Sequence, residues 1–418
     1  PADLDGRTWD ALEPYYRALL DRDLPDAKAL ERLILDRSEL DAAAHEAYAT
    51  LYIDMTCRTD DEAARDGYLN FVEHVEPTLK QVGFELDTRI AECPHAAALD
   101  QERYGVLLRS LRTDVELFRE ENIPLQTEET KLGQRYSETC GAMTVEFRGE
   151  TKTLPQMSPY MEETERATRE EAWRLVSQRR LADRATLDDI FEQMLAVRGR
   201  IAANAGKADY RDYAFAAKHR FDYGPAECEA FHRAAEELVV PLVAELNRER
   251  AELLGVDALR PWDLAVDVHG RAPLRPFSGA DELIERSSKL FHRLEGGDAG
   301  LGALFDTMRD GTSLDLEARP GKAPGGYQQS LDRRRRPFIF MNAAGTQRDV
   351  DTMIHEAGHA FHSMLCSDDP VRDYRHAPIE FAEVASMSME LLAHPYLDEF
   401  YSAGDVDRAR RTHLEGII

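Results

Sequence analysis

Cysteine is scarce in this chain, and its distribution excludes two kinds of stabilisation. The 418 residues contain five cysteines, an odd number without a CxxC pair. They are Cys57, Cys93, Cys140, Cys228 and Cys366. Disulfide frameworks and cysteine-based zinc sites need cysteines in regular pairs. We therefore expect reduced thiols, as is typical of a cytoplasmic protein.

Long apolar runs are also missing. No stretch of the sequence approaches the roughly 20 apolar residues that a membrane-spanning helix needs, and the first residues contain no apolar segment of the signal-peptide type. The sequence therefore predicts a protein that is not embedded in a membrane, and a cytoplasmic location is expected.

Positive charge is in deficit. Lysine and arginine together number 52, against 79 aspartates and glutamates, so the formal net charge is −27. Such a surface repels polyanions, which argues against nucleic acid and anionic membranes as partners. With 43% hydrophobic residues, a chain of this length can nevertheless bury a sizeable core and exceeds one small domain.

One stretch carries a recognisable chemical pattern. In Val350 to Leu365, apolar residues recur at the spacing of a helix with one buried face, and the stretch contains His-Glu-Ala-Gly-His. His355 and His359 lie one helical turn apart, so both imidazoles can reach a single metal ion. Glu356 is rotated by about 100° around the axis, where it can miss the metal yet reach a water bound to it. The pattern predicts an HExxH zinc site.

Two other interpretations of this stretch are possible. A buried helix with two hydrogen-bonded histidines and a solvated glutamate would need no metal. A metzincin needs a glycine three residues after the second histidine and a third histidine three residues further on, but this chain has His362 and Leu365 there. The metzincin class is therefore excluded, and the third ligand must come from elsewhere. His362, two turns from His355, is predicted to support the ligands rather than bind the same ion.

A second predicted helix, residues 377–392 with Pro378 at its start, carries three carboxylates on one stripe: Glu380, Glu383 and Glu390. Burying them on an otherwise apolar helix is costly unless a cation faces them. A zinc ion with two histidines is such a cation, so Glu383, in the middle, is the predicted third ligand. Glu380 and Glu390 are predicted to accept hydrogen bonds from the other N–H groups of the ligand histidines. A solvated face is the alternative.

Together these stretches resemble the zinc oligopeptidases typified by thimet oligopeptidase and oligoendopeptidase F, and the latter more closely. The matching residues are Gly321–Tyr327, Pro337–Gly345, the HEAGH motif and Glu380–Ser386. The resemblance implies a mainly α, multi-helix peptidase fold with a small β-sheet beside the zinc helix and a deep substrate cleft. It also implies one Zn²⁺ per chain on His355, His359 and Glu383, Glu356 as the general base, and short unfolded peptides as substrates.

The chain is expected to have two parts. Residues 1–200 are predicted to form an N-terminal helical region with a short hairpin near 144–154. Residues 201–418 are expected to form the zinc metallopeptidase catalytic domain, incomplete at its C-terminus. Within it, two short strands at about 327–330 and 337–342 are joined by the charged run Asp332–Arg336. That run is interpreted as a solvated turn, with contact to an anionic group near the cleft as the alternative.

The second of these strands directly precedes the zinc helix. An open strand edge offers backbone N–H and C=O groups to an extended peptide, and the resembling enzymes hold substrate beside this helix. On that basis the substrate-binding candidates are Asn342, Ala343, Ala344, Gly345 and Tyr327. The apolar run by itself favours an ordinary buried strand.

The function that follows is zinc-dependent hydrolysis of peptide bonds. Zinc activates a water, and Glu356 takes its proton and passes it to the leaving amine. The alternative is a catalytically weak or inactive helical protein, or fragment, that binds peptide or zinc and keeps the site for stability. An intact Glu356 favours the enzyme, because a purely structural site does not need a base beside an open coordination position.

The resemblance further implies a catalytic domain that continues beyond residue 418. Leu414, Ile417 and Ile418 leave the end of the sequence apolar. In the resembling family the later segment supplies a histidine and tyrosines that bind substrate, and losing one such donor costs a factor of about 10²–10³ in rate. We therefore expect this chain to bind zinc but to hydrolyse peptides poorly, with the remaining segment, as a separate chain, a candidate partner.

Overall fold

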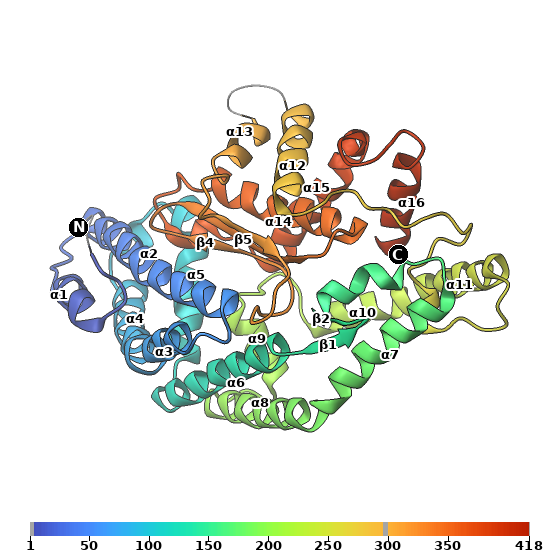
Figure 1. Ribbon diagram of the computed structural model, residues 1–418. Coiled ribbons are helices and arrows are strands. Elements are labelled where there is room, and N and C mark those ends of the chain that lie inside the picture. The colour runs from blue at the N-terminus through green and yellow to red at the C-terminus, as the bar shows by residue number, and fades with distance from the viewer. Residues whose placement is uncertain (1–3, 296–299, 418) are drawn as a thin grey trace.

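A computed structural model describes residues 4–295 and 300–417, and this part of the chain is mainly helical, as predicted (Figure 1). The helices are α1 Trp9–Leu20, α2 Ala27–Cys57, α3 Glu62–Asn70, α4 Glu76–Ala91, α5 Gln101–Leu117, α6 Ile123–Gly141, α7 Arg166–Ala182, α8 Arg184–Asn204, α9 Tyr210–Ala217, α10 Pro225–Ala234, α11 Val240–Leu254, α12 Ala280–Leu294, α13 Leu301–Asp306, α14 Gln347–Leu365, α15 Ile379–Ala393 and α16 Val406–Ile417. The strands are β1 Thr144–Phe147, β2 Glu150–Thr153, β3 Leu314–Glu317, β4 Tyr327–Leu331 and β5 Arg336–Ala343. Ile418, part of the predicted apolar end, lies outside the described residues.

Aspartates begin several of the N-terminal helices. The side chains of Asp26, Asp61 and Asp100 accept hydrogen bonds from backbone N–H groups in the first turns of α2, α3 and α5. These bonds satisfy donors that the start of a helix leaves unpaired. The apolar faces of α1, α2, α4 and α5 then pack into one core, in which Leu30 and Leu86 are fully buried. The N-terminal helices (blue in Figure 1) therefore share one core, to which Val371 after α14 also belongs.

The first two strands form the hairpin that the sequence predicted near residues 144–154. Strands β1 and β2 are antiparallel, with Val145 opposite Lys152. Arg148 and Gly149, between the strands, have φ angles of 54° and 85°, which is the backbone conformation of a type I′ turn. The predicted division between residues 200 and 201 lies within α8, which packs against α6, and the division itself stays a prediction.

The remaining strands form a sheet beside α14, in the order β3-β5-β4. Strand β5 is parallel to β3 and antiparallel to β4, so both of its edges are paired. The prediction that strand 337–342 offers a free edge to a peptide is therefore wrong. Residues 337–341 are all buried, as expected of a central strand with an apolar run. The edge strand that packs against α14 is β4.

The charged run between β4 and β5 is a turn, as predicted, and it is only partly solvated: Arg334 and Arg335 are exposed, whereas Asp332 is buried. Asp332 is 3% exposed, and its Oδ2 lies 2.6 Å from Arg372 Nε and 2.9 Å from His45 Nδ1. Arg334 Nε lies 2.7 Å from Glu46 Oε1. Because His45 and Glu46 belong to α2, the run ties the sheet to the N-terminal helices. The solvated-turn interpretation is thus confirmed for Arg334 and Arg335 and wrong for Asp332.

The largest core surrounds α14 and contains residues of α12, α13, α15 and α16 together with β3 and β5 (orange to red in Figure 1). All five cysteines are free thiols, as predicted. Within the described residues, no helix combines the length and the apolar character needed to cross a bilayer. The predicted deep cleft stays a prediction.

Candidate metal centre

Helix α14 places both histidines of the HEAGH motif on one face. The helix begins after Thr346, whose backbone N–H donates to Asp349 Oδ2 at 2.8 Å in a capping box. Its apolar face, which includes the fully buried Val350, belongs to the main core. The side chains of His355 and His359 remain 25% and 16% exposed. The helix therefore buries one side while the two imidazoles stay accessible.

Helix α15 brings Glu383 to these imidazoles. The Nε2 atoms of His355 and His359 lie 3.2 Å apart. Glu383 Oε2 lies 3.3 Å from the first and 3.8 Å from the second. The three residues that the sequence predicted as ligands thus lie together, with ligand atoms within 4.8 Å of one another.

The spacing and the donor types fit a zinc ion. Tetrahedral ligands at about 2.0–2.2 Å from zinc lie about 3.3–3.6 Å from one another, close to the separations of 3.2, 3.3 and 3.8 Å found here. Two imidazole nitrogens and one carboxylate oxygen form a donor set typical of zinc. Three protein ligands leave one coordination position free, as in catalytic sites.

A carboxylate orients the first histidine. Glu390 Oε1 lies 2.7 Å from His355 Nδ1, so Nδ1 donates its proton and Nε2 keeps its lone pair for the cluster. Burial would raise the pKa of Glu390, but hydrogen bonds from His355 and His413 lower it to about 2, so it is ionised at neutral pH. Burial lowers the pKa of His359, which also contacts the backbone of Ala382. A lowered pKa keeps His359 neutral, the form that binds metal.

Glu356 is a buried carboxyl group with spare hydrogen-bonding capacity. It is 7% exposed, and within the described chain its Oε2 has no hydrogen-bond partner. Burial raises its pKa to about 7, an effect opposed by His355 and reinforced by Glu383. A Cβ on Gly326 would stand 3.5 Å from Glu356 Oε1, so the start of β4 lies close to this carboxyl. The group can therefore exchange a proton near neutral pH, as a general base must.

Glu380 lies elsewhere than predicted. Its Oε1 accepts hydrogen bonds from Arg220 Nε, at 2.7 Å, and from the hydroxyl of Tyr223. The prediction that Glu380 accepts a hydrogen bond from a ligand histidine is therefore wrong, because Glu380 pairs with Arg220 from the segment after α9. His362 is half-buried on α14, and its supporting role stays a prediction.

Sequence reasoning missed a histidine in α16. His413 Nε2 lies 2.5 Å from Glu390 Oε2, so Glu390 contacts two histidines at once. His413 follows Glu390 by 23 residues and belongs to no motif. The contact forms only where α16 packs back toward α15, which local spacing cannot predict.

Tyr327, a predicted substrate-binding residue, contacts α2 and β5. Its hydroxyl forms a 2.6 Å hydrogen bond with Thr56 Oγ1 of α2. Its ring stacks on Phe340 of β5, with ring centroids 4.7 Å apart. The structure thus gives Tyr327 a packing role between the sheet and α2, and substrate contact by Tyr327 stays a prediction.

The other substrate-binding candidates hold the connection between β5 and α14. The Asn342 amide donates to the backbone oxygens of Ala323 and Gly325, each at 2.9 Å. The backbone N–H of Ala318 donates to the backbone oxygen of Ala343 at 3.2 Å, and the N–H of Ala344 donates to Asp349 Oδ2 at 2.9 Å. The next residue, Gly345, has a φ of 92°. Peptide contact by Asn342, Ala343, Ala344 and Gly345 stays a prediction.

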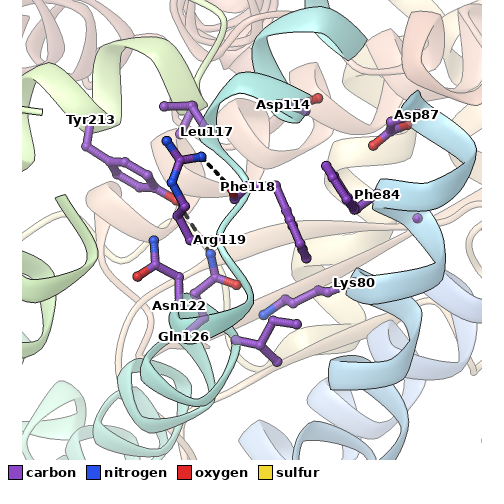
Figure 2. Close-up of a pocket in the computed structure, with 13 residues that line it drawn as sticks. Lys80, Phe84, Asp87, Asp114, Leu117, Phe118, Arg119, Asn122, Gln126 and Tyr213 are labelled. Carbon is purple, nitrogen blue, oxygen red and sulfur yellow. Dashed lines mark hydrogen bonds between the residues drawn. The ribbon is translucent and has the colours of Figure 1, made fainter. Parts of the chain in front are cut away.

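A separate pocket of about 320 Å³ lies among α4, α5, α6 and α9 (Figure 2). Phe84 and Phe118 stack in its wall with centroids 4.0 Å apart. Of its two carboxylates, Asp87 pairs with Arg37 and Asp114 with His219. None of the lining residues belongs to the metal cluster, and the two carboxylates already have partners.

Comparison with known proteins places this chain in a family. Residues 159–418 match the sequence model of peptidase family M3, so the chain belongs to that family. A 78-residue stretch is 36% identical to the chromosomal oligoendopeptidase F of Lactococcus lactis subsp. cremoris. This alignment spans 18% of the chain and 13% of that relative. The plasmid-encoded oligoendopeptidase F of the same subspecies is 35% identical over an equally long stretch.

Two solved structures superpose on nearly the whole of this chain. A protein assigned as an oligoendopeptidase F, from Bacillus anthracis str. Ames, superposes with a TM-score of 0.92 at 25% identity, over 98% of this chain and 74% of its own. PZ peptidase A, solved with an inhibitor, gives a TM-score of 0.93 at 26% identity, over 98% of this chain and 72% of its own.

Proposed function

We propose that this chain carries a zinc metalloendopeptidase centre that hydrolyses peptide bonds in short peptides, with one zinc ion per chain. Membership of peptidase family M3 and the names of the similar proteins support a peptidase. The observation that carries the proposal is Glu356, a buried carboxyl group whose Oε2 has no hydrogen-bond partner among the described residues. It lies beside a cluster of three candidate ligands.

His355, His359 and Glu383 would hold the zinc, which when bound would supply positive charge and Lewis acidity to the reacting carbonyl. Glu356 would accept the proton of the attacking water and then donate it to the leaving amine nitrogen. Its pKa of about 7 suits both steps, because near neutral pH the carboxyl can both take up and release a proton.

Edge strand β4 is the element best placed to align a peptide. It packs against α14, and Glu356 interacts with the backbone of Gln328 in this strand. A peptide added along β4 as a further strand would therefore run past the proposed base.

The alternative function, binding of peptide or zinc without turnover, explains fewer of these features. A structural zinc site is normally closed by four protein ligands, whereas here Glu383 is 42% exposed and three ligands are present. Burial of the Glu356 carboxyl raises its pKa and costs folding stability. A site that only binds metal would gain nothing from that cost.

The test is cleavage of a library of short quenched fluorescent peptides by the 418-residue chain. We expect turnover that a chelator abolishes and one equivalent of zinc restores. Zinc-loaded protein that cleaves none of the peptides would overturn the proposed activity and leave the binding-only alternative.

A further inference from the structure

A row of hydrogen-bonded side chains leads from the metal cluster into α16. Glu390 uses both carboxylate oxygens: Oε1 faces His355 Nδ1 at 2.7 Å and Oε2 faces His413 Nε2 at 2.5 Å. The other nitrogen of His413, Nδ1, lies 2.8 Å from His394 Nε2. Glu390 is thus held between a predicted metal ligand and a histidine of another helix.

The direction of these hydrogen bonds follows from the chemistry of the groups. An ionised carboxylate can only accept hydrogen bonds, so both imidazoles donate to Glu390. The terminal torsion of a glutamate is soft, and one donor alone would leave the carboxylate free to turn. Two donors on different oxygens fix its plane, and with it the direction from which Oε1 meets His355.

His413 is itself held in place by the docking of α16. Its side chain is 7% exposed. Gln347, at the start of α14, donates from Nε2 to the backbone oxygen of Ala409 at 2.7 Å. Arg410 Nε donates to the backbone oxygen of His394 at 2.9 Å. Because α16 is bonded to the helix that carries His355, His413 has a fixed position relative to the metal cluster.

We propose that His413 is a positioning residue for the metal centre. It fixes Glu390 so that Glu390 holds His355 with Nε2 directed at His359 and Glu383. This inference rests on the proposed zinc centre and adds a residue that no sequence motif indicates. Without His413, Oε2 of a half-buried carboxylate loses its donor, and Glu390 can turn away from His355.

The test compares Zn²⁺ affinity, measured by competition with a chelator, for the parent chain, His413→Ala and His413→Gln. Glutamine keeps an N–H donor near the position of His413 Nε2. We expect His413→Ala to bind zinc about 10- to 100-fold more weakly and His413→Gln to bind it like the parent. With Co²⁺ in place of zinc, the visible absorption spectrum should change in His413→Ala and not in His413→Gln.

A matched control removes another histidine–carboxylate pair. His292 Nε2 lies 2.8 Å from Asp306 Oδ2, and neither residue belongs to the metal cluster. His292→Ala should therefore leave the affinity and the spectrum unchanged. Thermal unfolding of the metal-free proteins separates loss of fold from loss of positioning.

Three results would overturn the proposal. The first is equal zinc affinity in the parent and His413→Ala, including the case in which the variant is merely less stable. The second is an equal loss in His413→Ala and His413→Gln, because the donor would then be irrelevant. The third is an unchanged Co²⁺ spectrum in His413→Ala. A parent chain that binds neither ion would instead refute the proposed metal centre before any variant is compared.

Discussion

Gly358 of α14 lies directly against Ser386 of α15: a Cβ on Gly358 would stand 2.7 Å from Ser386 Cα and 3.2 Å from the backbone oxygen of Ala385. Any larger residue at this position would have to push the helices apart. Gly358 stands between the two histidines of the motif, and Ser386 lies three residues after Glu383. The glycine therefore permits the close approach that brings Glu383 to His355.

Gly358→Ala should accordingly loosen the metal centre. Overpacking of this kind costs about 1–3 kcal/mol of stability, and displacement of α15 should also weaken zinc binding. Chemical unfolding and chelator competition measure the two effects. Gly199→Ala in α8 is the control, because nothing lies within 4 Å of its Cβ; it should gain about 1 kcal/mol from helix propensity. Parental zinc affinity in Gly358→Ala would contradict the role given to this contact.

The two glutamates of α15 should respond differently to substitution. Glu383→Ala removes a predicted ligand and should lose zinc during dialysis against a weak chelator. Glu380→Ala should retain much more, because Glu380 pairs with Arg220 rather than with a ligand histidine. Zinc content of the dialysed proteins measures the difference. Equal zinc in the parent and Glu383→Ala would exclude Glu383 as a ligand.

Glu356→Gln should separate metal binding from turnover. It removes the proton acceptor but no ligand, so zinc content should stay at the parental level while kcat falls about 10²- to 10⁴-fold. Burial raises the pKa of Glu356 to about 7, and only the ionised form accepts a proton. In the parent, kcat/KM should therefore fall as the pH drops below this pKa, with a midpoint below 7 because bound zinc favours the carboxylate. Near-parental turnover in Glu356→Gln would exclude Glu356 as the base.

Asp332→Asn should destabilise the fold in a pH-dependent way. Burial alone would raise the pKa of Asp332, but hydrogen bonds from His376 and His45 and the charge of Arg372 lower it well below its usual value of 3.8. A carboxyl group whose pKa is lower in the folded state than in the unfolded state stabilises the fold at pH values above its unfolded-state pKa. This stabilisation is lost as the pH falls from there toward the folded-state pKa. At pH 7 the variant should lose about 3 kcal/mol, as when one partner of a buried ion pair is removed.

Urea unfolding at pH 7 and pH 3 measures this effect, and the difference between parent and variant should be smaller at pH 3. The control is Asp66→Asn, because Asp66 is 68% exposed and pairs with the neighbouring Arg65. This variant should change stability by less than about 1 kcal/mol at either pH. A gap between parent and Asp332→Asn that widened on acidification would contradict the assigned direction of the pKa shift.

The sequence by itself determined the features that depend on local periodicity. The 3.6-residue repeat of α14 placed His355 and His359 one turn apart, and the spacing of carboxylates on the next helix selected Glu383. Both helices form where they were predicted, with the three side chains together. The sequence likewise indicated the hairpin near residues 144–154, which turns at Arg148 and Gly149. These predictions hold because helix geometry and turn conformation are set by residues close together in the chain.

Only the tertiary structure decided which distant segments meet. It made β5 a central strand, since β3 pairs with its other edge. It paired Glu380 with Arg220, and it buried Asp332 among residues of α2 and of the segment after α14. It also brought His413 to Glu390. A sequence pattern shows which side chains share a face, but the partner opposite that face depends on how the whole chain packs.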